Sequence, residues 1–139
     1  IDMIQIIAGR EGAGKTKNLI GMANDLTKVT DGHIVYVDAD NSHIYHLSHQ
    51  IRLIKPDEYP LESTSEFFGF VCGILSQDYD IATVFIDGLL KNAKVNPDKV
   101  DALLHKVDMV ATRYNVNFVI SMCCAPEELP DSVQQYLVS

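Results

Sequence analysis

Apolar positions along this chain follow two patterns that alternate from one end to the other. The first is a short continuous run of five or six residues rich in Ile, Val and Phe. Such a run is typical of a strand buried on both faces of a parallel sheet. Four runs of this kind occur, at residues 4–8, 33–38, 82–87 and 117–121. We therefore expect four central strands.

The second pattern places apolar residues three and four positions apart, which predicts helices with one buried face. It covers residues 17–28 and two later segments with recognisable helix starts. Ser63 and Glu66 have the spacing of a capping box, and Asn96-Pro97-Asp98 begins a helix that Asn115 ends. Three amphipathic helices are therefore expected between the four strands.

Three shorter segments have weaker patterns. Residues 41–50 are polar and predict a short helix, whereas residues 51–54 predict a short edge strand. Residues 131–138 fit either a short helix or a last edge strand.

The order of the predicted elements determines the expected fold class. Strands and helices alternate, so we expect an α/β protein: a three-layer sandwich whose mainly parallel sheet lies between helices joined by right-handed crossovers. A chain of 139 residues is long enough for one sizeable core and too short for two. We expect a single domain over residues 1–139.

Composition is that of a folded protein, with 47% hydrophobic and 22% charged residues. The apolar runs are too short to span a bilayer, and there is no signal-peptide pattern, so we expect a cytoplasmic protein without membrane contact. Met3 would be a natural first residue, which leaves open whether Ile1 and Asp2 are native.

The charge of the chain limits the kinds of partner that it is expected to bind. The formal net charge is −8, and the chain has only three arginines. Lys and Arg contacts to phosphates dominate nucleic-acid affinity, so strong binding of DNA or RNA by the chain itself is not expected. The three cysteines, Cys72, Cys123 and Cys124, lie in apolar surroundings, and we expect reduced thiols rather than disulfides.

The strongest chemical signal is Gly9-Arg10-Glu11-Gly12-Ala13-Gly14-Lys15-Thr16, which fits the pattern G-x-x-x-x-G-K-[ST] of a phosphate-binding loop, the P-loop or Walker A motif. Its glycines allow backbone N–H groups to converge on phosphate oxygens. Lys15 adds a cation for the β- and γ-phosphates, and the Thr16 hydroxyl is a ligand for Mg²⁺ at the start of the next helix. A strand before the loop and a helix after it provide the required context. We expect residues 9–16 to bind a nucleoside triphosphate.

Two predicted strands end in acidic residues. Asp38 and Asp40 follow the strand at 33–38, and Asp87 ends the strand at 82–87. Ligands of parallel sheets collect beyond the carboxyl ends of the strands, so both acidic ends are expected near the loop. In phosphate-loop proteins an acid at the position of Asp87 holds Mg²⁺, usually through a water molecule.

Three histidines near the first acidic end raise the question of a second metal. His43, His46 and His49 are spaced by three residues beside Asp38 and Asp40. Positions three apart drift around a helix axis, so all three imidazoles do not converge easily on one ion. We favour a polar surface near the nucleotide over a metal site there.

With these positions placed, the chain resembles the core of RecA-like (ASCE-type) P-loop ATPases. The loop at 9–16 and Asp87 match the family's nucleotide loop and its Mg²⁺-associated acid. The resemblance implies a RecA-like strand order, with the 117–121 strand between the loop strand and the Asp87 strand. It also implies that Asp40, or less favourably Asp38, polarises the attacking water, and that Ser121 senses the γ-phosphate.

The resemblance also bears on the nucleotide. It favours ATP over GTP, whereas no residue pattern in the sequence selects adenine over guanine, and no guanine-recognition pattern follows a strand. The chain is similar as well to a group of small bacterial ATP-binding proteins of about this length, a similarity that implies no particular activity.

Departures from the family keep several functions open. The family's base is normally Glu, Gly88 puts no carboxylate after Asp87, and DNA-binding loops and an oligomerisation segment are missing. We expect an ATP-binding protein with slow Mg²⁺-dependent hydrolysis, in which Lys15 and Asp40 are catalytic. The first alternative is a nucleotide-dependent regulatory or assembly module, with a homo-oligomer or another protein as partner. The second alternative is a small nucleotide or metabolite kinase, although such kinases need arginines that this chain lacks.

Overall fold

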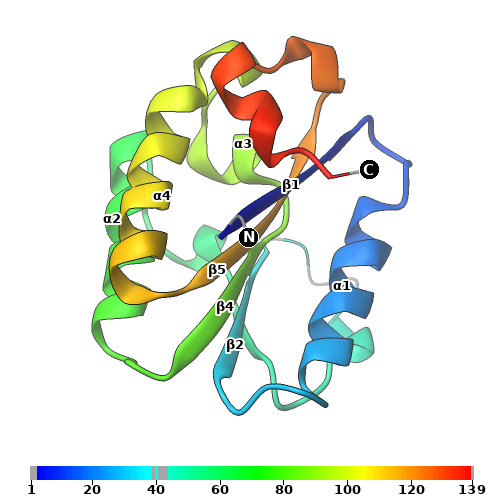
Figure 1. Ribbon diagram of the computed structural model, residues 1–139, viewed down its shortest axis with the longest axis vertical. Coiled ribbons are helices and arrows are strands. Elements are labelled where there is room, and N and C mark those ends of the chain that lie inside the picture. Colours follow the sequence, from blue (N-terminus) through cyan, green and yellow to red (C-terminus); the bar gives the residue numbers. More distant parts are fainter. Residues whose placement is uncertain (1–2, 39, 41–43, 139) are drawn as a thin grey trace.

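A computed structural model describes residues 3–38, 40 and 44–138 of the chain. Its regular elements alternate between strands and helices in sequence order (Figure 1). The strands are β1 (Ile4–Gly9), β2 (His33–Val37), β3 (Arg52–Ile54), β4 (Ile81–Ile86) and β5 (Asn117–Cys123). The α-helices are α1 (Lys15–Leu26), α2 (Thr64–Ser76), α3 (Leu89–Ala93) and α4 (Asp101–Tyr114).

The strands form one five-stranded sheet in the order β1-β5-β4-β2-β3, and every pairing between them is parallel. The prediction of an α/β fold with a mainly parallel sheet is confirmed. β5 lies between β1 and β4, as the family resemblance implies. The carboxyl ends of β1 and β4 therefore lie at one edge of the sheet, with a single strand between them.

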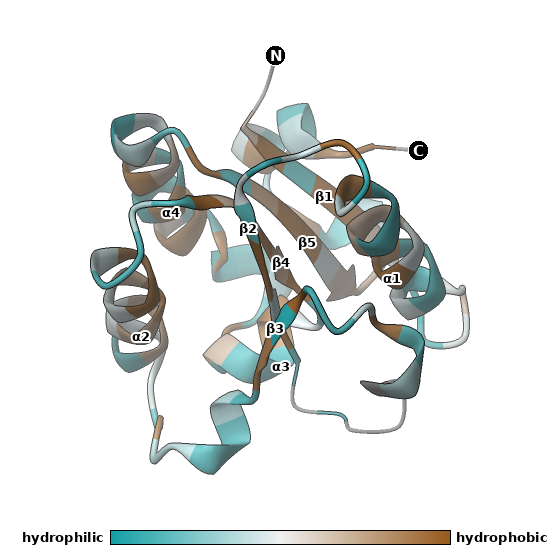
Figure 2. Cartoon of the chain, turned by 90° about the horizontal axis from the view of Figure 1, so that it is seen from below, coloured by the Kyte–Doolittle hydropathy of each residue, from teal (hydrophilic) through white to brown (hydrophobic). Residues whose placement is uncertain are grey.

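Helices cover both faces of the sheet, with α1 on one side and α2 and α4 on the other (Figures 1 and 2). Side chains alternate between the two faces along each strand. On β2, Val35 and Val37 belong to the core under α2 and α4, whereas Ile34 and Tyr36 belong to the core under α1. Burial on both faces is why the strands have nearly continuous apolar sequences.

Helix boundaries follow local capping chemistry. Ser63 accepts a hydrogen bond from the Glu66 backbone N–H at 3.1 Å, which begins α2 as expected. The Glu66 carboxylate reaches the Glu62 N–H instead of the Ser63 N–H, so the capping box is displaced by one residue on that side. A 3₁₀ turn at Pro97–Lys99 precedes α4, and Asn115 ends it in a left-handed conformation with φ of 56°.

The weaker predictions have mixed outcomes. Residues 52–54 form the edge strand β3, and a 3₁₀ turn at Ile44–His46 lies in the segment for which a short helix was expected. The C-terminal segment forms a short 3₁₀ helix at Asp131–Tyr136, and a single isolated bridge between Leu137 and Ile6 follows it in place of a strand. The short helix α3 was not predicted. Within the described residues, no helix has the length and apolar character needed to cross a bilayer.

Candidate functional site

The glycine-rich loop, residues 9–16, connects the carboxyl end of β1 to the first turn of α1. Gly12 and Gly14 have φ values of 87° and 82°, in the left-handed region that favours glycine. The Ala13 N–H donates to the Arg10 carbonyl oxygen at 3.1 Å and closes the loop. A Cβ at Gly9 would lie 3.3 Å from the Ala13 Cβ, so glycine there permits the close turn. The left-handed backbone therefore favours glycine at positions 12 and 14, and the tight contact with Ala13 favours it at position 9.

Lys15 is held inside the loop. Its side chain is buried, with 7% of its surface exposed, although lysine is rarely buried without a partner. The Nζ atom donates a hydrogen bond to the Arg10 carbonyl oxygen at 2.9 Å. The ammonium group is thus fixed over the loop.

The first turn of α1 has a charge pattern that is unfavourable for an isolated helix. The positive end of the helix dipole lies there, yet the turn contains Lys15 and Lys17, no acidic residue and no side-chain cap. A cation at this end typically costs about 0.3–1 kcal/mol. An anion bound at this end of the helix would reverse that penalty. The helix start is therefore suited to an anionic ligand.

A pocket of about 590 Å³, here called the loop pocket, lies against this helix start. It contains three lysines and two acids among its described lining residues, so its lining is positive in a chain whose net charge is −8. Its described lining consists of Glu11, Gly12, Gly14, Lys15, Thr16, Lys17, Asp87, Gly88, Leu90, Lys91 and Cys123.

Asp87, directly after β4, also lines the loop pocket. Its carboxylate is nearly buried and accepts two hydrogen bonds, from the Tyr36 hydroxyl at 2.9 Å and the Ser121 hydroxyl at 2.8 Å. Burial raises the pKa of Tyr36 far above its usual value, and the negative charge of Asp87 raises it further. Tyr36 therefore keeps its proton at neutral pH and remains a hydrogen-bond donor to Asp87. The two donors orient the carboxylate.

The Ser121 side chain is hydrogen-bonded to Asp87 and to the backbone of Gly88. Its side chain is 1% exposed, donates to Asp87, and accepts a hydrogen bond from the Gly88 N–H at 2.8 Å. It is not among the described residues that line the loop pocket. The geometry gives Ser121 a role in orienting Asp87, and its role in sensing the γ-phosphate remains a prediction.

Asp40, the predicted catalytic carboxylate, is exposed and does not appear among the described lining residues of the loop pocket. Its backbone N–H donates to the buried Asp38 side chain at 3.0 Å. Ala39 and residues 41–43, including His43, lie outside the described residues. The catalytic role of Asp40 therefore remains a prediction.

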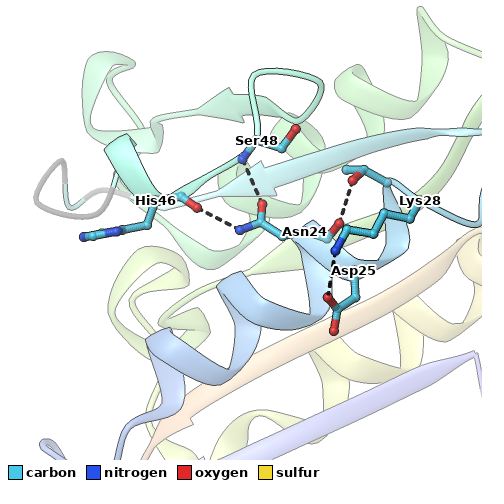
Figure 3. A network of polar contacts seen from close by, with 6 residues as sticks. Asn24, Asp25, Lys28, His46 and Ser48 are labelled. Atoms are coloured by element: carbon cyan, nitrogen blue, oxygen red, sulfur yellow. Dashed lines mark hydrogen bonds and ion pairs between the residues drawn. The ribbon is translucent and has the colours of Figure 1, made fainter.

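The segment that follows Asp40 is attached to α1 by one side chain. Asn24 donates to the His46 carbonyl oxygen at 2.8 Å and accepts from the Ser48 N–H at 2.8 Å (Figure 3). Asp25, on the same helix, forms an exposed ion pair with Lys28, which lies just beyond the end of the helix. Because the glycine-rich loop ends in the first turn of α1, Asn24 links the helix that follows the loop to the segment after the acidic end of β2.

Comparisons with known proteins support the architecture. No protein-family model and no curated protein matches the sequence. Among solved structures, the chain is similar to C. elegans PCH-2, with a TM-score of 0.51 and 19% identity over 90% of this chain and 31% of that one. At that identity the likeness shows a shared fold alone. The chain therefore spans about a third of the length of PCH-2.

Sequence reasoning missed several lining residues of the loop pocket. Lys17 is in the first turn of α1, and Lys91 is on α3, four positions after Asp87. Both reach the pocket because the loops after β1 and β4 meet at one edge of the sheet. The two lysines therefore follow the same rule as the acidic residues, since side chains beyond the carboxyl ends of parallel strands collect at one place. Cys123, at the end of β5, is an exposed thiol on the same lining.

Proposed function

We propose that the chain binds ATP with Mg²⁺ at the glycine-rich loop and hydrolyses it slowly, with an ATPase core of the RecA-like P-loop type. The observation that carries the proposal is the loop pocket, where Lys15, Lys17 and Lys91 meet the positive end of α1. A triphosphate offsets this concentration of positive charge, and an uncharged ligand does not. The fold shared with PCH-2 is compatible with the proposal and adds no activity to it.

In this proposal each residue acts through an ordinary interaction. The N–H groups of the loop hold the β-phosphate, and Lys15 exchanges its bond to the Arg10 carbonyl for phosphate oxygens. Thr16 and Asp87, which both line the loop pocket, are the residues that fit Mg²⁺, with Asp87 acting through water. The bound Mg²⁺ supplies charge stabilisation of the phosphoryl oxygens in the transition state.

Two carboxylates are candidates for orienting the attacking water. Asp40 corresponds to the family's catalytic position, and Glu11 is the carboxylate besides Asp87 in the described lining of the loop pocket. Both are exposed. We assign the role to Asp40 and use Glu11 as the comparison.

Phosphate release from ATP, measured together with ATP binding on the same samples, tests the proposal. We expect slow Mg²⁺-dependent release from the wild type, loss of release in Asp40→Asn with binding retained, and little change in Glu11→Gln. Lys15→Ala is expected to bind ATP at least about tenfold more weakly and to release less phosphate. If Glu11→Gln loses phosphate release while Asp40→Asn retains it, Glu11 and not Asp40 orients the water.

If the chain binds ATP through Lys15 but releases no phosphate, the regulatory or assembly module becomes the better proposal than the hydrolase. A nucleotide-dependent change in oligomeric state, measured by sedimentation, would then be the expected readout. Absence of Mg²⁺-ATP affinity in the millimolar range would refute both functions.

A second candidate function, phosphoryl transfer, is favoured by one specific observation. A pocket of about 330 Å³ next to α3 is lined by Asp57, Tyr59 and Lys94 among others, and it shares Lys91 with the loop pocket. An acceptor there would direct an anionic group at the two lysines and a hydroxyl at Asp57. The acceptor oxygen would form the new bond to the γ-phosphorus, ADP would leave, and Asp57 would take the hydroxyl proton. The test is a screen of phosphorylated nucleosides as acceptors, each incubated with Mg²⁺-ATP. If this function holds, one of them gains a further phosphate, and the Lys94→Ala variant forms less of that product.

A further inference from the structure

Three side chains of types that can bind metal ions lie near one another at the opposite edge of the sheet, where β2 and β4 begin. His33, Asp78 and Asp80 each offer one ligand atom, and these three atoms lie within 4.8 Å of one another. The His33 Nδ1 atom is 2.7 Å from the Asp78 Oδ2 atom. The residues come from two segments 45 positions apart, which the pairing of β2 with β4 brings together.

The backbone around this group is fixed by the sheet. The His33 N–H donates to the Asp80 carbonyl oxygen at 2.8 Å, and the Asp80 N–H donates to the Asp78 Oδ1 atom at 2.9 Å. A Cβ at Gly32 would overlap the Cβ of Ala82, so glycine allows the two segments to approach this closely. The register between β2 and β4 also shifts between His33 and Ile34, and such an irregularity re-aims the side chain at that point.

We propose that His33, Asp78 and Asp80 form a binding site for one divalent transition-metal ion, of the zinc or cobalt class. One imidazole nitrogen and two carboxylate oxygens suit these ions, whereas Mg²⁺ prefers oxygen ligands alone. Ligand bonds of about 2.0–2.2 Å place neighbouring tetrahedral ligands about 3.3–3.6 Å apart. In the structure the His33 Nδ1 and Asp78 Oδ2 atoms touch directly at 2.7 Å, so the ion would replace this contact and the two side chains would move apart to bind it. Water completes the coordination, because the group is exposed to solvent.

The site is separate from the loop pocket. Asp80 precedes β4 and Asp87 follows it, so the six residues of β4 separate the two sites by roughly 20 Å. Metal at His33 would connect the amino ends of β2 and β4, and it would stabilise the sheet from the edge opposite the nucleotide. The proposal does not depend on nucleotide binding.

Zinc titration followed by NMR of the histidine rings tests the proposal on the full chain. We expect the His33 ring signals to shift at micromolar Zn²⁺ while those of His105, an exposed histidine on α4, stay unchanged. Millimolar Mg²⁺ is expected to leave the His33 signals in place. Zn²⁺ affinity from calorimetry is expected to fall tenfold or more in His33→Ala and in Asp80→Asn.

Control variants address the other groups that bind zinc. His49→Ala and Cys123→Ser remove an exposed imidazole and an exposed thiol elsewhere, and both are expected to retain the wild-type affinity. The proposal is overturned if the His33 signals do not move with Zn²⁺, or if Asp80→Asn binds as tightly as the wild type. Asp80→Asn keeps the size of the side chain, so its result does not depend on refolding around a cavity.

Discussion

Tyr36 extends from β2 under α1 and donates its hydroxyl hydrogen to Asp87 at the end of β4. Its ring stacks on Phe85, with ring centroids 5.8 Å apart, so the hydroxyl has little freedom to turn away. Together with Ser121, it holds a nearly buried carboxylate in one orientation. A carboxylate oriented in this way is suited to accept hydrogen bonds from a metal-bound water without reorganising.

The neutral state of Tyr36 gives a test by pH. Burial raises its folded pKa above the ordinary value of about 10. Its contribution to stability is therefore complete below about pH 10 and is lost as the pH rises above that value, because only the unfolded chain releases the proton. We expect the free energy of unfolding in urea to fall above about pH 10, and to fall less steeply in Tyr36→Phe. Equal slopes for the two proteins would show that Tyr36 ionises as freely in the fold as outside it.

The same pair of residues marks a limit of the sequence analysis. Asp87 was expected near the glycine-rich loop because it ends an apolar strand, and the structure places it on the loop pocket. Its partner Tyr36 lies 51 positions away and was not predicted, since strand order decides which side chains meet. Ser121 was assigned to the γ-phosphate by resemblance, and nothing local in the sequence predicts its bond to Asp87.

At the scale of elements, α1 serves two purposes. Its first turn belongs to the glycine-rich loop, and Asn24 in its last turns holds the segment around His46 and Ser48. A shift of the helix start on ligand binding would therefore reach the segment after β2. The connection uses one side chain and two backbone groups.

Asn24→Ala is expected to release that segment. It removes two hydrogen bonds, each worth about 0.5–1.5 kcal/mol, so unfolding in urea should require about 1–3 kcal/mol less. Hydrogen exchange of the Ser48 amide should become faster. Asn24→Asp is the matched control, because its carboxylate still accepts from Ser48 but no longer donates to His46. Unchanged exchange at Ser48 in the alanine variant would contradict this role.

Predictability differed between elements for physical reasons. The strands buried on both faces were recognised from continuous apolar runs, and the α2 start from Ser63, because burial and capping are local in sequence. The five residues of α3 are too few for a helical period, so the helix that carries Lys91 was missed. The cluster of His33, Asp78 and Asp80 was not predicted, because the pairing of β2 with β4 creates it and no local spacing in the sequence marks it.

For the molecule as a whole, charge is distributed unevenly. The net charge is −8, yet three of the eight lysines line the loop pocket. Repulsion among these cations is released when the pocket holds a polyanion. Binding to the folded chain alone then adds to its stability by mass action.

Thermal unfolding measures that effect without any catalysis. At a hundredfold excess over the dissociation constant, ligand binding adds about 2.7 kcal/mol, which corresponds to a rise of roughly 5–10 °C for a chain of this size. We expect pyrophosphate and Mg²⁺-ATP to raise the melting temperature and adenosine to leave it unchanged. The rise with pyrophosphate should shrink with added salt, because the attraction is electrostatic. An equal rise with adenosine would indicate that the site recognises the base instead of the phosphates.

The central claim is that the glycine-rich loop binds a triphosphate through Lys15, and calorimetric titration with Mg²⁺-ATP tests it most directly. Lys28→Ala, at an exposed lysine beyond the other end of α1, is the matched control. A charged hydrogen bond contributes about 1.5–3 kcal/mol, so Lys15→Ala should weaken binding at least about tenfold while Lys28→Ala matches the wild type. Wild-type affinity in Lys15→Ala would contradict the account.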